Sequence, residues 1–235
     1  MLKSKFIERS PLRILDQSTH GRLMPGCLGA WISQKGVGKT ACLVHLAIDQ
    51  MLQDRNVLHI SFSDSPAHLH RWYDNIFEEL SKAFQLDEAR RIRDELFVRR
   101  VFLTFDSPDL SVAHIEKTIC TIKDDGHFDP GLIIVDGYKF GPGSHDQLRE
   151  FKGFVKKLGS AAWFSSTLQP GTKPPEPGKI PDPMTAVADL FEILISLQPE
   201  NRHIQLKLVK DYDHPVAENT HLQLEPRTML IKADS

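Results

Sequence analysis

The sequence predicts an α/β fold in which a mostly parallel, twisted sheet is flanked by helices and carries an antiparallel extension near the C-terminus. Two observations support this class. Short apolar segments alternate with longer helical patterns, and most of them lack the polar alternation of a half-exposed sheet. Strands of a parallel sheet are covered on both faces, so such continuous apolar segments are expected. The last third of the chain is instead rich in strand patterns, as in 203–210, where Ile204, Leu206 and Leu208 alternate with polar residues.

The expected elements follow one another without an internal repeat. Strands are expected over 27–33, 57–63, 101–105, 132–136 and 161–168. Helices are expected over 40–53, along the amphipathic stretch 66–95, and over 111–124 and 144–158. Strands within 191–197, 203–210 and 221–232 are expected to pair antiparallel and to extend one edge of the sheet.

The chain is expected to form one domain over residues 1–235. Its length and its 40% hydrophobic content suffice for one sizeable core. Residues 1–11 form an expected N-terminal tail, and the proline-rich residues 169–184 form an expected mobile loop.

Charge and cysteine content limit the classes of partner. The formal net charge is −2, from 29 Lys and Arg against 31 Asp and Glu, so no global basic field attracts nucleic acid or an anionic membrane. Cys27, Cys42 and Cys120 have no pair spacing, which favours reduced thiols and a cytoplasmic location. No apolar run reaches the roughly 18 residues that a membrane span needs, so no membrane partner is expected.

The segment SQKGVGKT at 33–40 has the pattern of a phosphate-binding loop. A strand is expected before it and a helix after it, so backbone N–H groups and the positive end of the helix dipole point to one place. Gly36 and Gly38 permit the required backbone conformations, and Lys39 is expected to reach the β and γ phosphates. The expected nucleotide-binding residues are Ser33, Gln34, Lys35, Gly36, Val37, Gly38, Lys39, Thr40 and Ala41. The simpler alternative is a glycine turn with a surface lysine.

Asp136 is the expected second half of the nucleotide site. It ends the apolar strand LIIVD, and the carboxyl ends of parallel strands meet at one edge of the sheet. The carboxylate would orient Mg²⁺ through water, and the hydroxyl of Thr40 would bind the ion directly. Thr40 and Asp136 are therefore the expected metal residues. An aspartate at a strand end is also common as a turn former.

Four stretches resemble the RecA, KaiC and DnaB group of ATPases. Leu15-Asp16 followed by 21–26 (GRLMPG) is similar to the segment that precedes the phosphate loop in this group. Ser33 replaces the first glycine of the group's loop motif. Residues 105–119 resemble the passage before the group's acidic strand, and Ala188-Asp189 resembles a later segment. The resemblance, over about 12–212, implies a RecA-like P-loop NTPase domain that binds ATP and Mg²⁺. It also implies self-assembly into a homo-oligomer that places the nucleotide between subunits.

The chain departs from the group at two catalytic positions. Ser63 stands where relatives carry the glutamate that activates the attacking water, and Asp64 lies one residue further. Of the late K-x-R pair that reaches a neighbouring subunit's γ-phosphate, Lys210 is present, but Tyr212 replaces the arginine. The expected catalytic residues are Lys39, Asp64 and Lys210, with weak hydrolysis. Asp106 is the alternative acid.

Three positions stay open. The residue that senses the γ-phosphate could be Ser165, Ser166, Thr167 or Gln169. The proline-rich loop lies where RecA and DnaB relatives contact DNA, but a loop without that role is favoured. Residues 90–100 hold five arginines that could bind nucleic acid or a partner subunit, whereas the interleaved acids favour a solvated charged face.

Three functions are therefore weighed. The first is a weak Mg²⁺-dependent ATPase that acts through self-assembly on DNA or on a protein partner. The second is a regulatory or scaffold module whose conformation depends on nucleotide occupancy with little or no turnover. A MinD- or ParA-like ATPase is less favoured, because Lys35 lies four residues before Lys39 and the signature lysine of that family lies five before.

Overall fold

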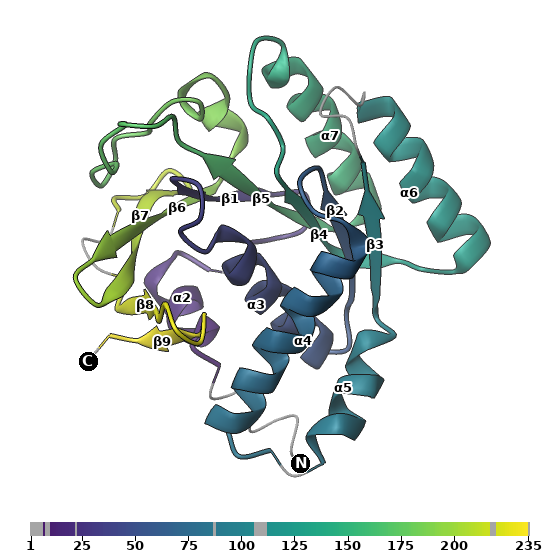
Figure 1. Cartoon of the computed structure of the whole chain (residues 1–235). Coiled ribbons are helices and arrows are strands. Elements are labelled where there is room, and N and C mark those ends of the chain that lie inside the picture. The colour runs from purple at the N-terminus through teal and green to yellow at the C-terminus, as the bar shows by residue number, and fades with distance from the viewer. Residues whose placement is uncertain are drawn as a thin grey trace.

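One mixed sheet organises the molecule. The computed structural model describes residues 7, 10–21, 23–86, 88–105, 112–216 and 220–234. Within them, nine strands form a sheet with the order β3-β2-β4-β5-β1-β6-β7-β8-β9 (Figure 1). The strands are β1 (Leu28–Ser33), β2 (Asn56–Ser61), β3 (Arg100–Thr104), β4 (Pro130–Asp136), β5 (Ala161–Thr167), β6 (Ile193–Glu200), β7 (His203–Asp211), β8 (Leu222–Leu224) and β9 (Ile231–Ala233). The predicted α/β class with a mostly parallel sheet is confirmed.

Helices cover both faces of the parallel part of the sheet (Figure 1). They are α2 (Leu12–Ser18), α3 (Lys39–Leu52), α4 (Pro66–Ala83), α5 (Ala89–Phe97), α6 (Val112–Gly126), α7 (Ser144–Leu158) and the short 3₁₀ helix η1 (Thr185–Leu190). Apolar residues of α2, α3, α4 and α5 pack on one face, and those of α6, α7 and η1 pack on the other. None of the described helices is both long enough and apolar enough to cross a membrane.

Two helices, α4 and α5, occupy the amphipathic stretch 66–95. Ser65 begins α4 by accepting a hydrogen bond from the backbone N–H of His68, and Pro66 fits the first turn. The helix ends at Ala83, and Gln85 then adopts a φ of 50°, which a right-handed helix cannot continue. The apolar stripe resumes in α5, so the sequence pattern conceals the break.

The antiparallel extension is confirmed for β7, β8 and β9 but is wrong for β6. Strand β6 runs parallel to β1, with Ala30 opposite Leu194, and only then does β7 pair antiparallel with β6. The reason is the connection. The chain from 168 to 192 returns to the amino end of the sheet before β6 starts, whereas a short turn at 201–202 joins β6 to β7.

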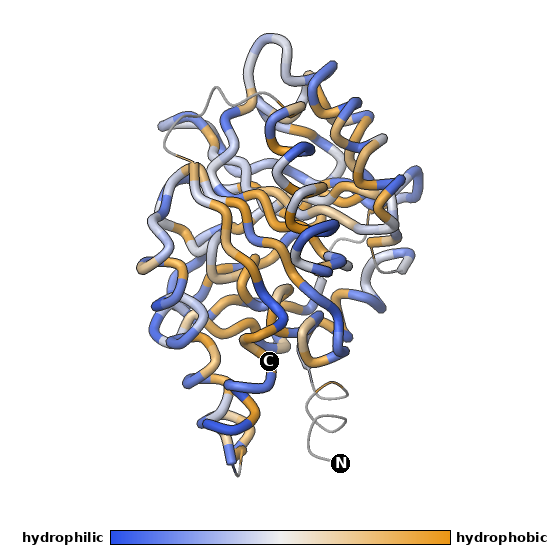
Figure 2. The backbone as a smooth tube through the Cα atoms, turned by 90° about the vertical axis from the view of Figure 1, so that its right-hand side faces the viewer, coloured by the Kyte–Doolittle hydropathy of each residue, from blue (hydrophilic) through white to orange (hydrophobic). Residues whose placement is uncertain are grey.

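Two apolar clusters, one on each face of the sheet, form the core. Figure 2 shows the apolar residues gathered in the strands that cross the middle of the molecule. Trp31 and Trp163 stack with ring centroids 5.4 Å apart. Trp163 lies over its register partner Gly29, where an added Cβ would come within 2.9 Å of the indole. Glycine at this strand position therefore leaves room for the ring.

The proline-rich residues 169–184 are tied to the sheet by hydrogen bonds. The backbone N–H of Gly178 donates to the carbonyl of Val209 at 3.2 Å, and the amide of Gln198 donates to the carbonyl of Pro175 at 2.7 Å. Gln34 also donates from its side chain to the carbonyl of Thr172 at 3.2 Å. The loop thus lies beside the segment that follows β1, and its mobility stays a prediction.

Two fully buried histidines are held in neutral form. Nε2 of His45, on α3, lies 3.0 Å from the carbonyl of Met229, and burial lowers the pKa of this histidine to about 4. His59, on β2, lies 3.1 Å from the hydroxyl of Tyr73, and burial likewise lowers its pKa to about 4. Both values lie below the ordinary histidine pKa of about 6.5. Protons therefore bind the unfolded chain more readily than the folded one.

We expect the two neutral histidines to contribute their full stabilisation above pH 6.5. The free energy of unfolding should then fall as the pH is lowered from 6.5 towards 4. Each buried histidine contributes a slope of about 1.4 kcal/mol per pH unit in that window. Urea unfolding at several pH values measures the slope. His45→Gln, whose amide can donate to the same carbonyl, should reduce it, whereas His127→Asn at an exposed site should leave it unchanged. An identical slope in wild type and His45→Gln would contradict this assignment.

Candidate functional site

Four parallel strands end at one edge of the sheet. The register places Ser61 opposite Asp136 at the ends of β2 and β4, and Ser33 opposite Thr167 at the ends of β1 and β5. Side chains alternate between faces along a strand, so Asp136 shares a face with Ile134, which packs in the same cluster as α3. The predicted meeting of the loop and the acid at this edge therefore follows from register and alternation.

The loop 34–38 connects β1 to α3 through two glycines with positive φ. Gly36 has a φ of 81° with open space beside it, and Gly38 has a φ of 112° directly before the first residue of α3. A Cβ on Gly38 would lie 2.5 Å from Cδ2 of Leu224 in β8. The positive φ thus requires glycine at Gly38, and the side chain of Leu224 packs against it.

Lys39 is buried, and its side chain folds back onto the loop. Its Nζ donates to the carbonyl of Gln34 at 3.0 Å and to both the carbonyl and the hydroxyl of Ser33 at 3.2 Å. Burial lowers the pKa of Lys39 to about 8, although the nearby carboxylate of Asp136 acts in the opposite direction. A buried ammonium held mainly by neutral oxygens is well suited to pair with an anion.

Thr40 and Asp136 are in direct contact. The hydroxyl of Thr40 donates to Oδ2 of Asp136 at 2.7 Å. On the other side, the hydroxyl of Ser165 donates to Oδ1 of Asp136 at 2.5 Å and accepts from the backbone N–H of Gly137 at 2.9 Å. The carboxylate is therefore fixed by two hydroxyls from α3 and β5. Of the four open positions, Ser165 is the one bonded to the acid.

The end of β2 carries the expected catalytic acid, but that acid already has a partner. Asp64 donates its backbone N–H to the hydroxyl of Ser61 at 3.0 Å, and its carboxylate lies 2.5 Å from Nδ1 of His68. Ser63 is exposed and lies against Gly137, where an added Cβ would be 2.9 Å from its own. The sequence reasoning missed the role of His68, for which the i, i+4 spacing from Asp64 was the available signal.

Lys210 does not point to the loop 34–38 of its own chain. On β7 it lies opposite Leu194 near the start of β6, and its Nζ donates to the carbonyls of Ala188 at 2.7 Å and Phe191 at 2.6 Å. These contacts hold the end of η1. Tyr212 follows at the end of β7 with a φ of 48°. The structure therefore does not bring Lys210 together with Lys39, Thr40 and Asp136.

The remaining sequence-derived positions are dispersed. Ser166 is fully buried in β5, and its hydroxyl has no hydrogen-bond partner among the described residues. Thr167 and Gln169 are exposed beyond it. Arg22 and Asp106 lie outside the described residues.

The arginine-rich stretch is paired largely within the chain. Its described ion pairs join Arg91 to Glu88 and Glu95, Arg93 to Asp74 and Asp94, and Arg99 to Asp54. The Arg100 guanidinium lies over the Phe97 ring, 3.5 Å from its centroid. These contacts favour the charged-face interpretation of the cluster.

The chain matches no protein-family model and no curated protein in sequence comparisons.

We expect Ser165→Ala to destabilise the fold and Ser166→Ala to leave it unchanged. Ser165 satisfies a buried carboxylate oxygen and a backbone N–H, and leaving such groups unpaired costs about 1–3 kcal/mol. Ser166 is the matched control, because it neighbours Ser165 in β5 and its hydroxyl has no hydrogen-bond partner among the described residues. Urea unfolding of both variants at neutral pH makes the comparison. If the two variants were equally stable, the hydrogen bonds of Ser165 to Asp136 and Gly137 would not stabilise the fold.

Proposed function

We propose that the chain binds ATP with Mg²⁺ as a RecA-like P-loop protein and hydrolyses it only weakly. The observation that carries the proposal is the 2.7 Å contact between Thr40 and Asp136 beside the buried ammonium of Lys39. Lys39 and Thr40 begin α3, whereas Asp136 ends β4, almost a hundred residues further along the chain. Their convergence is what a nucleotide site requires.

The phosphate end of the nucleotide fits the loop. The first backbone N–H groups of α3 have no partner within the helix, and the helix dipole adds partial positive charge there. Lys39 now binds carbonyl and hydroxyl oxygens of Ser33 and Gln34, which are weaker partners than a phosphate. A phosphate at this place would relieve the cost of burying the ammonium.

The residues present also fit a magnesium ion. The hydroxyl of Thr40 and the carboxylate of Asp136 are hard oxygen ligands, which Mg²⁺ prefers together with water and phosphate oxygens. When bound, the ion would neutralise charge on the transferred phosphate. Ser165 and the backbone of Gly137 hold Asp136 in place for this role.

Weak turnover is expected because no free carboxylate ends β2. Ser63 cannot act as a general base, and the carboxylate of Asp64 is bonded to His68. Binding and metal contacts do not depend on either residue. The proposal therefore separates nucleotide binding from hydrolysis.

A regulatory or scaffold module without turnover is the second candidate. It is favoured by the contacts of Lys210, whose ammonium is used within its own chain, and by Tyr212 at the position of the expected arginine. Self-assembly, and a protein or nucleic-acid partner, stay predictions in both versions.

We expect Lys39→Ala to weaken ATP binding by about 100-fold or more, because it removes charge-assisted hydrogen bonds worth about 1.5–3 kcal/mol each. Titration calorimetry with Mg²⁺-ATP measures the affinity. Lys157→Ala is the control, since Lys157 is an exposed lysine near the end of α7, outside the loop. Unchanged affinity in a folded Lys39→Ala variant would overturn the phosphate-loop assignment.

We expect Ser63→Glu to raise the steady-state rate of ATP hydrolysis, because general-base assistance contributes about 10²- to 10⁴-fold. Ser63→Gln, of equal size and without a carboxylate, should not raise it. Asp64→Ala should lower the rate only if Asp64, with His68, already supplies the base. A wild-type rate that matches Ser63→Glu and is unaffected by Asp64→Ala would place the catalytic acid elsewhere.

A further inference from the structure

A cavity of about 290 Å³ lies at the amino end of the strands, away from the phosphate loop. It is enclosed by α2, by the C-terminal half of α3 and by the first residues of β4, β5 and β6. Its size is in the range of small-molecule sites. No residue of the phosphate loop lines it, so it is independent of the proposed nucleotide site.

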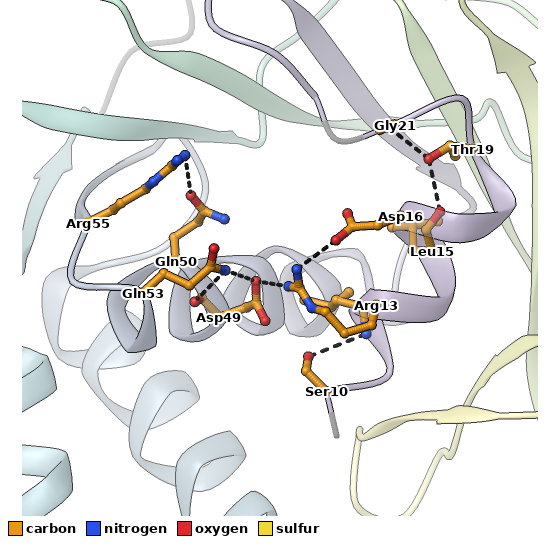
Figure 3. A network of polar contacts seen from close by, with 11 residues as sticks. Ser10, Arg13, Leu15, Asp16, Thr19, Gly21, Asp49, Gln50, Gln53 and Arg55 are labelled. Atoms are coloured by element: carbon orange, nitrogen blue, oxygen red, sulfur yellow. Dashed lines mark hydrogen bonds and ion pairs between the residues drawn. The ribbon is translucent and has the colours of Figure 1, made fainter. Parts of the chain in front are cut away.

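One wall of the cavity is a built network of charges (Figure 3). Arg13 of α2 donates to Asp16 at 2.7 Å and also to Asp49, which is buried on α3. The amide of Gln53 donates to the same oxygen of Asp49 at 2.6 Å. Burial raises the pKa of Asp49, and the guanidinium of Arg13 opposes that shift. These acids are therefore held by an arginine already present in the fold.

Arg55, at the exposed mouth, differs from Arg13 because no acid of the described chain pairs with it. Within the described residues its guanidinium has no carboxylate partner and donates only to Oε1 of Gln50, at 3.3 Å (Figure 3). Its stem lies beside Gly131 at the start of β4, where an added Cβ would be 3.4 Å from the Cβ of Arg55. An arginine fork beside a side-chain amide presents several N–H donors to an entering group.

Another part of the wall is apolar and incompletely covered. Trp163 lines the cavity, and its ring is fixed by Gly29 and Trp31. Leu46 lies between fully buried neighbours on α3, yet it stays partly exposed. Met24, at the rim, is 59% exposed, although large apolar side chains elsewhere in the described chain are almost all covered. This wall offers apolar surface that a ligand could remove from water.

We propose that this cavity binds a small amphiphilic carboxylate. The carboxylate pairs with the guanidinium of Arg55 and the amide of Gln50, a planar arrangement that arginine favours. The apolar body lies against Leu46 and Trp163. A positive ligand group is disfavoured at the mouth by Arg55, and deeper in the cavity Asp16 and Asp49 share the guanidinium of Arg13.

The link between α2 and α3 does not by itself explain the cavity. The ion pairs of Arg13 need only the two helices, whereas the cavity extends past them to Trp163 and Arg55. Empty apolar volume lowers the stability of the fold. Water can fill the polar side, but it gains little against leucine and tryptophan.

Straight-chain carboxylates from butanoate to decanoate test the proposal by calorimetry and by tryptophan fluorescence, on the full chain without nucleotide. We expect saturable binding that tightens about fourfold per added methylene, from about 0.8 kcal/mol each, until the chain fills the cavity. Octanoate should bind at least about tenfold more tightly than 1-octanol, because the alcohol has no charge for Arg55.

Arg55→Gln should lower the octanoate affinity at least about tenfold and leave that of 1-octanol unchanged. Leu46→Trp, which fills the cavity, should abolish binding of both. Arg99→Gln is the control, because Arg99 is a nearby arginine paired with Asp54 outside the cavity. If no carboxylate bound saturably to the wild type, the cavity would hold only water and the proposal would be overturned. Equal affinities for acid and alcohol, or an unaltered affinity in Arg55→Gln, would overturn the carboxylate assignment.

Discussion

The burial of α3 on nearly all sides is the constraint on which the rest of the structure depends. Three of its polar residues, Lys39, His45 and Asp49, are buried with its apolar ones. Burying polar groups is costly without partners, and each of the three finds its partner in a different segment. Lys39 binds the preceding loop, His45 meets the carbonyl of Met229 near the C-terminus, and Asp49 pairs with Arg13 of α2. One helix thus determines where the loop 34–38, the C-terminal strands and the N-terminal helix must lie.

Much of the parallel sheet could be predicted from the sequence because its strands are apolar and short. The segment 132–136 and the helix 144–158 are found almost where they were expected. Helix α2 was not predicted, since its seven residues give too short a pattern and its N-cap residue is Pro11, which has no capping side chain. The direction of β6 could not be predicted either, because a strand's direction depends on the path of the connection before it and not on its own residues.

For the candidate site, the sequence could supply residue types but not partners. The motif placed Lys39 and Thr40, and the strand end placed Asp136, because these roles follow from local pattern. The bond from Ser165 to Asp136 depends on the register of β5, which no local pattern specifies. In the same way, the distance of Lys210 from the loop follows from the antiparallel course of β7. Local sequence pattern thus identifies candidate residues, whereas the pairing of distant strands decides which of them come into contact.

The two ends of α3 face two different chemical environments that the same helix connects. Its start contacts β8 through Gly38 and Leu224, and its last turns contact α2 through Asp49. Between them, His45 is held by the carbonyl of Met229. Because these contacts are buried and closely packed, α3 can shift along its axis only if the C-terminal strands or α2 move with it. The loop 34–38 and the distant cavity are therefore joined by one buried helix whose partners lie in separate segments of the chain.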